Sequence, residues 1–500
     1  MRTNSVETRS LAGADIGPDR LASSRGRVAL LLALAAPLLF LNLGSWVFDT
    51  NDQARFPMLA QDILTESHWL VPRLDGVPHL NKPPLHAWLV ALASWPTGAV
   101  TQWTASLPSV FAALVVVLAT YWVARRFFNG EAALVAGLTV LTTYGVFLFG
   151  RSSMPDMTFS AATTVAMAAF VAFEVDGRRW PLVLFYSMVG IAFWTKGPAG
   201  LLPVAVAAAY CGLTYGWAGL RRIVSAPGLF VLVGLIALWG MLVVGASKSH
   251  PFVNDVLIAD LLQWYVPRGG RTWFRFVDPF VQALTILLPW SVLLPGALWA
   301  AARPVDAASA RAARLLLVWL LGVFVLVAIS DQQRMRYYLP LCPPAAMLIA
   351  GWYARLGVRW RGVGFAGIWI LVVSTGITID GYTLARHNRA TDLVPAVREL
   401  SHASHVYAVD APELVFAYYL QRPVTVLPSY RDFEAQARRG QDGYLIIAER
   451  AVGPALSGAL PQLPAAVVGG RRFVILSGDA TASGTAFNGR AARTEPGRAR

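Results

Sequence analysis

Long apolar runs, separated by short polar loops, constrain the fold of this chain more than any other feature. Runs of about 18 or more apolar residues recur along the sequence, and each is long enough to cross a hydrocarbon core of roughly 30 Å. The 500 residues are 56% hydrophobic and only 14% charged. Strands of a membrane barrel would be roughly ten residues long with alternating polarity, which these runs lack. The sequence therefore predicts an α-helical polytopic membrane protein.

Eleven segments are expected to span the membrane. They lie at about 28–48, 106–124, 131–149, 157–174, 180–195, 199–216, 228–246, 279–300, 313–330, 337–354 and 362–380. The segment 83–95 is also apolar, but thirteen residues are few for a span. Pro83 and Pro84 suit the first turn of a helix, where a missing N–H group costs nothing. We expect 83–95 to form an interfacial or re-entrant helix.

The arginines predict the orientation of these spans. If 83–95 does not cross, one side receives the N-terminus and the arginine-rich loops near 125, 178, 221, 303–314 and 355–361. The positive-inside rule makes that side cytoplasmic. The loops 49–105, 150–156, 195–200, 247–278 and 331–336 then face the periplasm. The net charge of +14 is accounted for by topology, so nucleic acid is not expected as a partner. The predicted location is the inner (plasma) membrane, with a cytoplasmic N-terminus.

The composition changes near residue 385, where the apolar runs end. Short strands are expected at 405–411, 423–428, 443–449 and 471–478, with helices at 413–420 and 431–439 between them. This alternation predicts a small α/β domain. The expected organisation is a cytoplasmic segment 1–27, a transmembrane domain 28–380, a periplasmic α/β domain 385–478 and a disordered tail 479–500. Cys211 and Cys342 both lie inside apolar runs, so neither a disulfide framework nor a cysteine-based metal site is expected.

Charged residues of the predicted outer loops are the candidates for a functional site. Asp52 and Arg55 follow the first span, Lys82 precedes Pro83, and Asp156 enters the fourth span. Further candidates are Arg151, Lys196, Arg268, Arg271, Arg334, Arg336 and Tyr337. Charges near a bilayer are costly unless they are paired or functional. The alternative for each of them is an interfacial ion pair or a snorkelling side chain.

The balance of these charges indicates an anionic substrate. Many cations and few carboxylates face one compartment at the membrane surface, which suits an anionic lipid headgroup. Lysine binds phosphate as a point charge and arginine binds it as a planar fork. If the phosphate leaves in a reaction, the same cations stabilise its developing charge. A nearby aspartate could then serve as a base towards an acceptor hydroxyl.

The first outer loop carries a specific resemblance. Its sequence, DQARFPMLAQDILTESHWLVPRLDGVPHLNKPPLHAWLVALAS, begins at Asp52 and resembles the corresponding loop of the ArnT-like and protein-mannosyltransferase-like glycosyltransferases. Those enzymes, of the family 39 and 83 type, have the GT-C fold and use polyprenyl-phosphate sugars. Three pieces carry the match: D-x-A-R, W-x-x-P-R-L-x-G-V-P and K-P-P-L. The segments RSSMPDM and YYLPLCPP agree in type and order, and the resemblance covers roughly 28–350.

The resemblance implies roles for individual residues. Asp52 and Asp156 would flank the reaction centre as catalytic carboxylates, and Lys82 would contact the lipid phosphate. The remaining expected substrate-binding residues are Arg55, Arg268, Arg271 and Tyr337. Gln53 and Asn81 stand where the family carries glutamates, and the second of these glutamates is associated with a metal ion. No metal site is therefore assigned. A divalent metal ion stays open, with His79 and His86 as the nearby candidate ligands.

These expectations lead to one main functional reading and two alternatives. The main reading is a glycosyltransferase that moves a sugar from a polyprenyl-phosphate donor to a lipid, glycan or protein acceptor on the periplasmic face. A transporter or flippase for a lipid or lipid-linked sugar would also place charges in a membrane protein, but near the bilayer midplane. The third reading is a non-catalytic member of the same fold. The positions of the charges relative to the helix ends discriminate between the first two.

Overall fold

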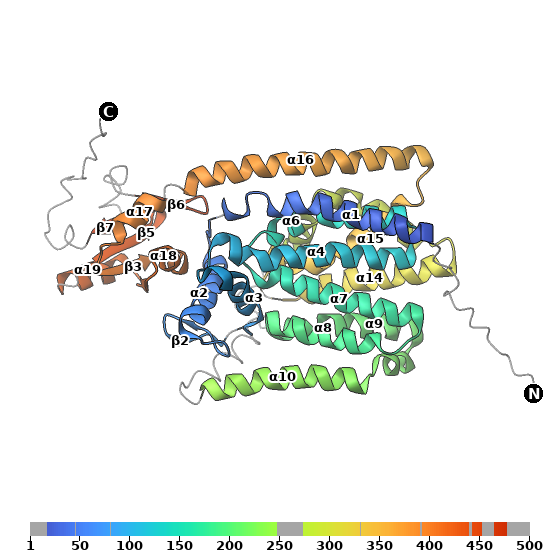
Figure 1. The fold of residues 1–500 in the computed structure, drawn as a ribbon, viewed down its shortest axis with the longest axis horizontal. Coiled ribbons are helices and arrows are strands. Elements are labelled where there is room, and N and C mark those ends of the chain that lie inside the picture. The colour runs from blue at the N-terminus through green and yellow to red at the C-terminus, as the bar shows by residue number, and fades with distance from the viewer. Residues whose placement is uncertain are drawn as a thin grey trace, which may run out of the picture.

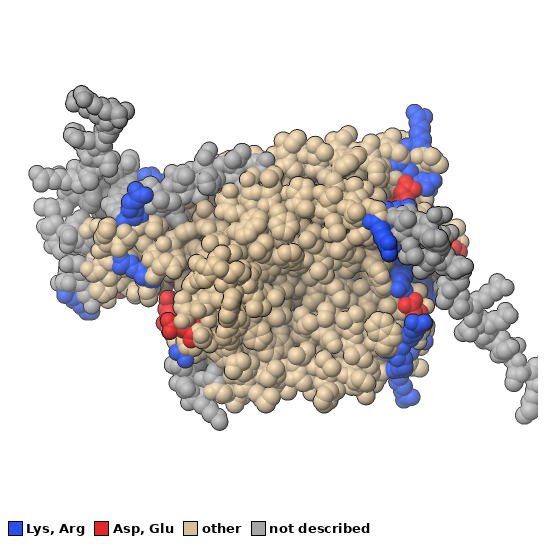
Figure 2. Space-filling view, viewed as in Figure 1, with Lys and Arg blue, Asp and Glu red and all other residues tan. Residues whose placement is uncertain are grey.

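The computed structural model describes residues 18–45, 47–80, 82–247, 274–330, 332–390, 393–439, 443–452 and 465–477. Long helices lie side by side in one bundle, and a small α/β domain sits at one end of it (Figure 1). We call this end of the bundle the domain end and the other the far end. Figure 2 shows charged side chains gathered at the two ends, with a broad belt between them in which this face carries no charge. The polytopic α-helical class and the small α/β domain are confirmed.

The helices of the bundle follow the predicted apolar runs. They are α1 (Pro18–Phe40), α4 (Gln102–Phe127), α5 (Gly130–Leu141), α6 (Tyr144–Gly150), α7 (Pro155–Asp176), α8 (Pro181–Lys196), α9 (Leu202–Tyr215), α10 (Ala226–Ser247), α12 (Phe274–Ile286), α13 (Leu294–Ala302), α14 (Ala307–Ala328), α15 (Cys342–Tyr353) and α16 (Val358–Ala390). By length and composition alone, the described residues hold seven candidate spans, or up to nine if two bent pairs each count as one. The bent pairs are 130–150, with a bend of 57°, and 276–302, with a bend of 106°.

The contacts of α8 and α9 show that 181–215 crosses the bundle twice. Lys196 ends α8 beside Asp156, which is the second residue of α7. Tyr215 ends α9 and donates a hydrogen bond to Glu174, near the other end of α7. Since the two helices reach opposite ends of α7, they run in opposite directions. The close approach of Gly200 to the backbone of Phe193 marks the reversal.

A second short segment also crosses. The 3-10 helix η6 (Met335–Leu341) leads directly into α15. Arg336 of η6 contacts Asp156 at the domain end, whereas Tyr353 of α15 donates a hydrogen bond to Glu131 at the start of α5, at the far end. If each bent pair is one pass, the addition of α9 and α15 brings the described helices to the eleven passes that the sequence predicts. By length alone, α8 and α9 are counted as one span of 35 residues, and α15, with twelve residues, is too short to be counted.

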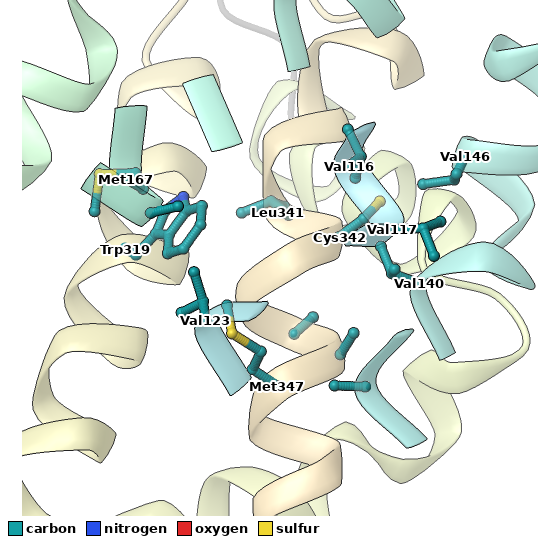
Figure 3. Packing of buried hydrophobic residues seen from close by; sticks show 14 of the residues in the cluster. Val116, Val117, Val123, Val140, Val146, Met167, Trp319, Leu341, Cys342 and Met347 are labelled. Carbon is teal, nitrogen blue, oxygen red and sulfur yellow. The ribbon is translucent and has the colours of Figure 1, made fainter. Parts of the chain in front are cut away.

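The core of the bundle gathers around α4, α7 and α15. Figure 3 shows Val116 and Val117 packed near Cys342, and Met167 beside Trp319, so that apolar side chains of several passes interdigitate. In its most apolar stretch, α7 is 83% buried, against 17% for α16. The central position of α7 matters for function, because the helix that begins beside Asp156 is held on all sides by its neighbours.

The predicted first outer loop folds at the domain end as helices and a hairpin. Its elements are α2 (Asn51–Glu66), β1 (Arg73–Leu74), β2 (Val77–Pro78), α3 (Leu85–Ser94) and the 3-10 helix η2 (Trp95–Thr97). The ten residues of α3 span about 15 Å, half of a hydrocarbon core. This length agrees with the expectation that 83–95 does not cross. Both α2 and α3 share a hydrophobic cluster with the α/β domain.

The α/β domain is built on one five-stranded sheet. Its elements are α17 (Leu393–Leu400), β3 (His405–Val409), α18 (Glu413–Leu420), β4 (Thr425–Val426), α19 (Tyr430–Arg438), β5 (Gly443–Ala448), the 3-10 helix η7 (Glu449–Ala451), β6 (Ala465–Val468) and β7 (Arg471–Ser477). The strand order is β4-β3-β5-β7-β6. β3 pairs in parallel with β4 and β5, while β7 is antiparallel to β5 and β6. The four expected strands are confirmed, and β6 is an additional one.

Two of the expected segment boundaries fall inside helices of the structure. α1 begins at Pro18, inside the segment 1–27, and α16 continues through the expected boundary at 385. Residues 1–17 and the tail 479–500 lie outside the described residues.

Candidate active site

Asp52 stands at the first turn of α2, where it meets three arginines. The N-cap Thr50 accepts a hydrogen bond from the Gln53 N–H at 3.3 Å, which fixes the start of the helix. The Oδ1 of Asp52 accepts from Arg55 Nη1 at 3.0 Å. Its Oδ2 accepts from Arg334 Nη1 and from Arg336 Nη2, both at 2.6 Å. One carboxylate is therefore shared by three guanidinium groups.

Asp156 lies deeper and is paired with a lysine. Its side chain is 3% exposed, and its Oδ1 accepts from Lys196 Nζ at 2.5 Å. The same oxygen lies 3.7 Å from Arg336 Nε. Asp156 stands at the domain end of α7, and Lys196 stands at the domain end of α8. A buried pair of this kind is costly to desolvate unless further partners satisfy it, and Arg336 supplies that partner.

Arg336 connects the two carboxylates. One nitrogen of its guanidinium contacts Asp52 and another faces Asp156, which matches the planar fork of the arginine side chain. Its side chain is 17% exposed, and Nη1 also lies 3.6 Å from the sulfur of Met154. We call Asp52, Asp156, Arg55, Arg334, Arg336 and Lys196 the charge cluster. Its four cations outnumber its two carboxylates, so the cluster carries a surplus of positive charge.

The electrostatics of Asp52 follow from this surplus. Burial alone would raise the pKa of the Asp52 carboxyl, but Arg336 and the two other arginines lower it to about 2. Burial lowers the pKa of the nearby His79, and the positive charges of Arg55 and Lys82 lower it further, to about 3. Lys82 therefore adds to the positive potential of this region. Neutral His79 and ionised Asp52 are the forms present at neutral pH.

Tyr337 forms an aromatic wall of the cluster. Lys196 Nζ lies 4.5 Å from the centre of its ring, and the Arg336 guanidinium carbon lies 5.5 Å from it. A second ring, that of Phe159, lies 5.1 Å from Lys196 Nζ. These cation–π contacts orient both cations without neutralising them.

The two candidate metal ligands sit beside the cluster and do not form a ligand set. His86 is fully buried, with its Nδ1 3.1 Å from the Thr158 hydroxyl and its ring edge-on to Phe56. Burial lowers the pKa of His86 to about 4. Across the described part of the chain, no three His, Cys, Asp or Glu side chains gather closely enough to hold a metal ion.

Other predicted candidates lie apart from the cluster or outside the described residues. Arg151 is 1% exposed and donates hydrogen bonds to the carbonyls of Leu38 and Leu41 at the end of α1. Its contacts are therefore those of a helix-capping residue. Arg268, Arg271 and Asn81 fall outside the described residues.

The structure brings together most of the expected residues and gives partners to Arg336 and Lys196, which were candidates without an assigned role. Asp52, Asp156, Arg55 and Tyr337 meet in one place, with Lys82 close by. The central role of Arg336 and the pairing of Lys196 were not predicted, although both residues stand among the outer-loop charges. Their positions at span ends were the available signal: Lys196 is the last residue of α8, and Arg336 is the second residue of η6.

An apolar cavity lies between α3, α4, α7 and α8 in the adjoining part of the bundle. Its volume is about 360 Å³, and its lining includes Leu89, Phe111, Val165 and Ile191. Thr158 also lines it, two residues along α7 from Asp156. The cavity thus shares α7 with the charge cluster, and its apolar lining suits a hydrocarbon chain.

Comparison with known proteins gives one family match and several relatives. The sequence profile of the family described as "Dolichyl-phosphate-mannose-protein mannosyltransferase" matches residues 81–245. An undecaprenyl phosphate-alpha-4-amino-4-deoxy-L-arabinose arabinosyl transferase of Edwardsiella ictaluri is 28% identical over 346 residues, which is 65% of this chain and 59% of the relative. The enzyme of that name from Pectobacterium carotovorum is 26% identical over 70% of this chain and 64% of the relative. The chain thus spans about three fifths of the length of these relatives.

Solved structures agree on the fold. ArnT from Cupriavidus metallidurans, in a crystal structure bound to undecaprenyl phosphate, superposes with a TM-score of 0.70 at 20% identity, over 91% of this chain and 98% of that one. An oligosaccharyltransferase from Archaeoglobus fulgidus superposes with a TM-score of 0.53 at 12% identity, over 86% of this chain and 69% of that one. The chain therefore has the GT-C fold, and its resemblance to the ArnT-like and protein-mannosyltransferase-like glycosyltransferases is confirmed.

Proposed function

We propose that this protein is a membrane glycosyltransferase that moves a sugar from a polyprenyl-phosphate donor to a lipid, glycan or protein acceptor. The observation that carries the proposal is the charge cluster, in which Arg336 joins two carboxylates among surplus cations at the ends of membrane helices. The relatives named as arabinosyl transferases use an undecaprenyl-phosphate sugar according to their names, which supports this donor class.

The donor is proposed to bind with its phosphate against Lys82 and the arginines and with its chain among the helices. Arg334 is 48% exposed, so its guanidinium is accessible to a phosphate that arrives from the membrane surface. Guanidinium and ammonium groups both form short charge-assisted hydrogen bonds to phosphate. Arg268, Arg271 and Tyr337 are further proposed contacts, from the loop 247–278 and from η6. The apolar cavity between α3, α4, α7 and α8 suits part of an isoprenoid chain.

The proposed reaction is a substitution at the anomeric carbon. The acceptor oxygen forms a bond to this carbon while the bond from the carbon to the phosphate oxygen breaks, and polyprenyl phosphate leaves with the bonding electron pair. The surplus cations stabilise the negative charge that develops on the leaving phosphate. Inversion at the anomeric carbon is the expected stereochemical result of a single displacement.

The role of the carboxylates depends on the acceptor. A hydroxyl acceptor must lose a proton, and Asp52 or Asp156 would take it. A pKa of about 2 makes Asp52 a weak base while its arginines surround it. When a donor phosphate shares these arginines, the pKa of Asp52 rises towards its ordinary value. If the acceptor is itself a phosphate, as in lipid A modification by ArnT-like enzymes, no base is needed and Asp52 would orient the arginines.

The proposed cellular arrangement is an inner-membrane protein with the charge cluster and the α/β domain in the periplasm. The far end carries the arginine-rich loops, with Arg126, Arg222 and Arg361 in ion pairs there. By the positive-inside rule this end would be cytoplasmic. Polyprenyl-phosphate sugars would then be used on the periplasmic face.

A lipid transporter or flippase is the second candidate function. Such proteins bind their substrates near the bilayer midplane, commonly at breaks in helices. The break at 286–290 between α12 and α13 favours this alternative, because it bends the chain by 106°. The charge cluster favours transfer, because its members stand at the helix termini of the domain end.

Transfer by the reconstituted protein tests the proposal. The purified chain is placed in liposomes with undecaprenyl phosphate-alpha-4-amino-4-deoxy-L-arabinose and lipid A, and products are measured by mass spectrometry. We expect Asp52→Asn and Lys82→Ala each to abolish transfer while the protein still inserts and folds. Glu66→Gln, at the other end of α2, and Arg73→Ala, an exposed cation of the same loop, are matched controls.

Two results would overturn the assignment. Normal transfer by both Asp52→Asn and Lys82→Ala would remove the charge cluster from the chemistry. Movement of a labelled donor lipid across the bilayer, with no transfer to any acceptor, would favour the transporter. A comparison of glycolipids and glycoproteins from cells with and without the protein identifies the acceptor class if lipid A is not accepted.

A further inference from the structure

The α/β domain touches the bundle through α18, which lies on α2 (Figure 1). The side chain of Asn51 uses both of its polar atoms in this contact. Its Nδ2 donates to Glu413 Oε2 at 2.7 Å, and its Oδ1 accepts from the Leu414 N–H at 3.1 Å. This amide therefore joins the first residue of α2 to the first turn of α18.

Two tyrosines of α18 hold the chain on either side of α2. The Tyr419 hydroxyl accepts from the Phe48 N–H at 3.2 Å and from Gln102 Nε2 at 3.0 Å. The Tyr418 hydroxyl donates to the Val100 carbonyl at 2.7 Å, and its ring stands edge-on to Phe48 at 5.0 Å. The start of α2 and the start of α4 are thus tied to the same helix of the α/β domain.

The turn between β6 and β7 also contacts the segment that precedes α2. Gly469, between β6 and β7, has a φ of +58°, which a residue with a side chain rarely adopts. A Cβ atom at this position would come within 3.2 Å of Asp49 Cβ and 3.3 Å of the Asp49 carbonyl oxygen. The backbone of the domain therefore packs directly against the residue that precedes Thr50, the N-cap of α2.

We propose that these contacts position Asp52, so that the α/β domain is a part of the active site. The clasp consists of Glu413, Tyr418, Tyr419 and Gly469, which surround residues 48–51. Asp52 is the next residue, and both of its 2.6 Å contacts are made to arginines of the segment 334–336 rather than to α2 itself. This proposal rests on the role of Asp52 in the proposed transfer reaction.

The geometry explains why such a clasp matters. α2 belongs to an extramembrane loop, whereas Arg336 begins a membrane pass, so no single helix fixes their separation. A hydrogen bond of 2.6 Å tolerates little displacement, and a misplacement of about 1 Å in a catalytic site can cost about 100-fold in rate. The domain contacts the residues directly before Asp52, and the arginines contact Asp52 itself. It is therefore a positioning device for the carboxylate.

A reciprocal exchange across the clasp tests the proposal. Asn51→Asp places a second carboxylate against Glu413, and we expect kcat for transfer to fall about tenfold because the repulsion displaces the start of α2. An acidic residue at this position favours the helix itself through the helix dipole, so helix loss is not the cause. In the double variant Asn51→Asp/Glu413→Gln, the introduced amide donates to the introduced carboxylate, and the Leu414 N–H still has its acceptor. Activity should return to within about twofold of the wild type.

Two single variants serve as controls. Glu413→Gln keeps an acceptor for Asn51 Nδ2 and should leave kcat within about twofold. Arg450→Ala removes an exposed ion pair with Asp410 within the same domain, and should leave both kcat and KM unchanged. A loss in Asn51→Asp that the double variant fails to restore would overturn the proposal, because the added charge itself would then be responsible.

Amide hydrogen exchange supplies a readout that does not need activity. Exchange at residues 51–58 should quicken in Asn51→Asp and return to the wild-type rate in the double variant, with undecaprenyl phosphate absent. If the wild type transfers no sugar, the proposed function fails while this exchange pattern still tests the clasp. Unchanged exchange in Asn51→Asp, together with wild-type kcat, would show that the domain does not position α2.

Discussion

The two ends of the bundle carry the same types of charged residue in different arrangements. At the far end, Arg126 pairs with Asp176 at 2.7 Å, Arg222 with Glu174 at 3.4 Å, and Arg361 with Glu131 at 3.7 Å. Each of these pairs joins one cation to one carboxylate, and all of the side chains except that of Glu174 are partly exposed. At the domain end, two carboxylates are shared among four cations, and the pair of Asp156 and Lys196 is buried while Arg334 stays exposed.

The difference teaches that the ratio of cations to carboxylates, rather than residue type, separates the two ends, together with one pair that is buried on both sides, Asp156 with Lys196. One-to-one pairs at a surface are worth little and are consistent with topology and helix registration. A surplus of cations at a low-dielectric site keeps positive charge available, and such a site attracts an anion strongly. The comparison predicts that equivalent substitutions at the two ends have very different consequences.

The largest difference is expected from removal of Arg336. Arg336→Met should lower kcat/KM for transfer at least about 10³-fold, because a preorganised cation that contacts both carboxylates is lost. Arg336→Lys should restore little, since an ammonium group cannot present two nitrogens in a fixed plane. Steady-state transfer in liposomes measures the effect. If Arg336→Met lowered kcat/KM less than tenfold, the charge cluster would contribute no more to transfer than the ion pairs of the far end.

The next effect is on stability and concerns Lys196. Lys196→Met leaves the buried Asp156 with a 3.7 Å contact to Arg336 in place of its close lysine partner, and should lower the free energy of unfolding by about 3 kcal/mol. Lys196→Arg retains the charge and is the matched control. Thermal unfolding in detergent measures the difference. An unchanged melting temperature in Lys196→Met would show that Asp156 is already satisfied by other partners.

A smaller effect is expected from pH through His86. The folded protein lowers the pKa of His86 from 6.5 to about 4, so between these values the unfolded chain binds a proton that the folded protein does not. Stability therefore falls as pH decreases below 6.5, by about 2 kcal/mol between pH 7 and pH 5. His86→Gln should remove this part of the pH dependence. Unfolding measured at both pH values in the two proteins checks the sign and size.

The smallest effect is expected at the far end. Arg126→Ala removes a solvent-accessible ion pair with Asp176, and should change stability by less than about 1 kcal/mol and transfer not at all. The two substitutions Arg126→Ala and Arg336→Met thus form the sharpest test of the comparison. A comparable loss of transfer in both would mean that arginines of the bundle act mainly on folding.

The sequence predicted the membrane passes more completely than it predicted the contacts of the candidate site. Apolar length identifies a span without knowledge of its neighbours, and the passes of α9 and α15 were predicted as the apolar runs 199–216 and 337–354. The arginines decided only that 83–95 does not cross. The pairing of charges is different, because Arg334 and Asp52 are separated by 282 positions and no local pattern links them. Arg151 and Arg336 look alike in the sequence, yet one caps α1 and the other connects two carboxylates. Tertiary contacts alone decide between those two roles.

The capping of α1 by Arg151 has a consequence for biogenesis. The last carbonyl groups of a helix have no partner within the helix, and an unsatisfied carbonyl next to hydrocarbon is costly. At the end of α1, the carbonyls of Leu38 and Leu41 accept hydrogen bonds from Arg151, which is synthesised 113 and 110 residues after them. The end of the first pass, and the loop that leads from it to Asp52, therefore reach their final form only after the third pass has left the translocon.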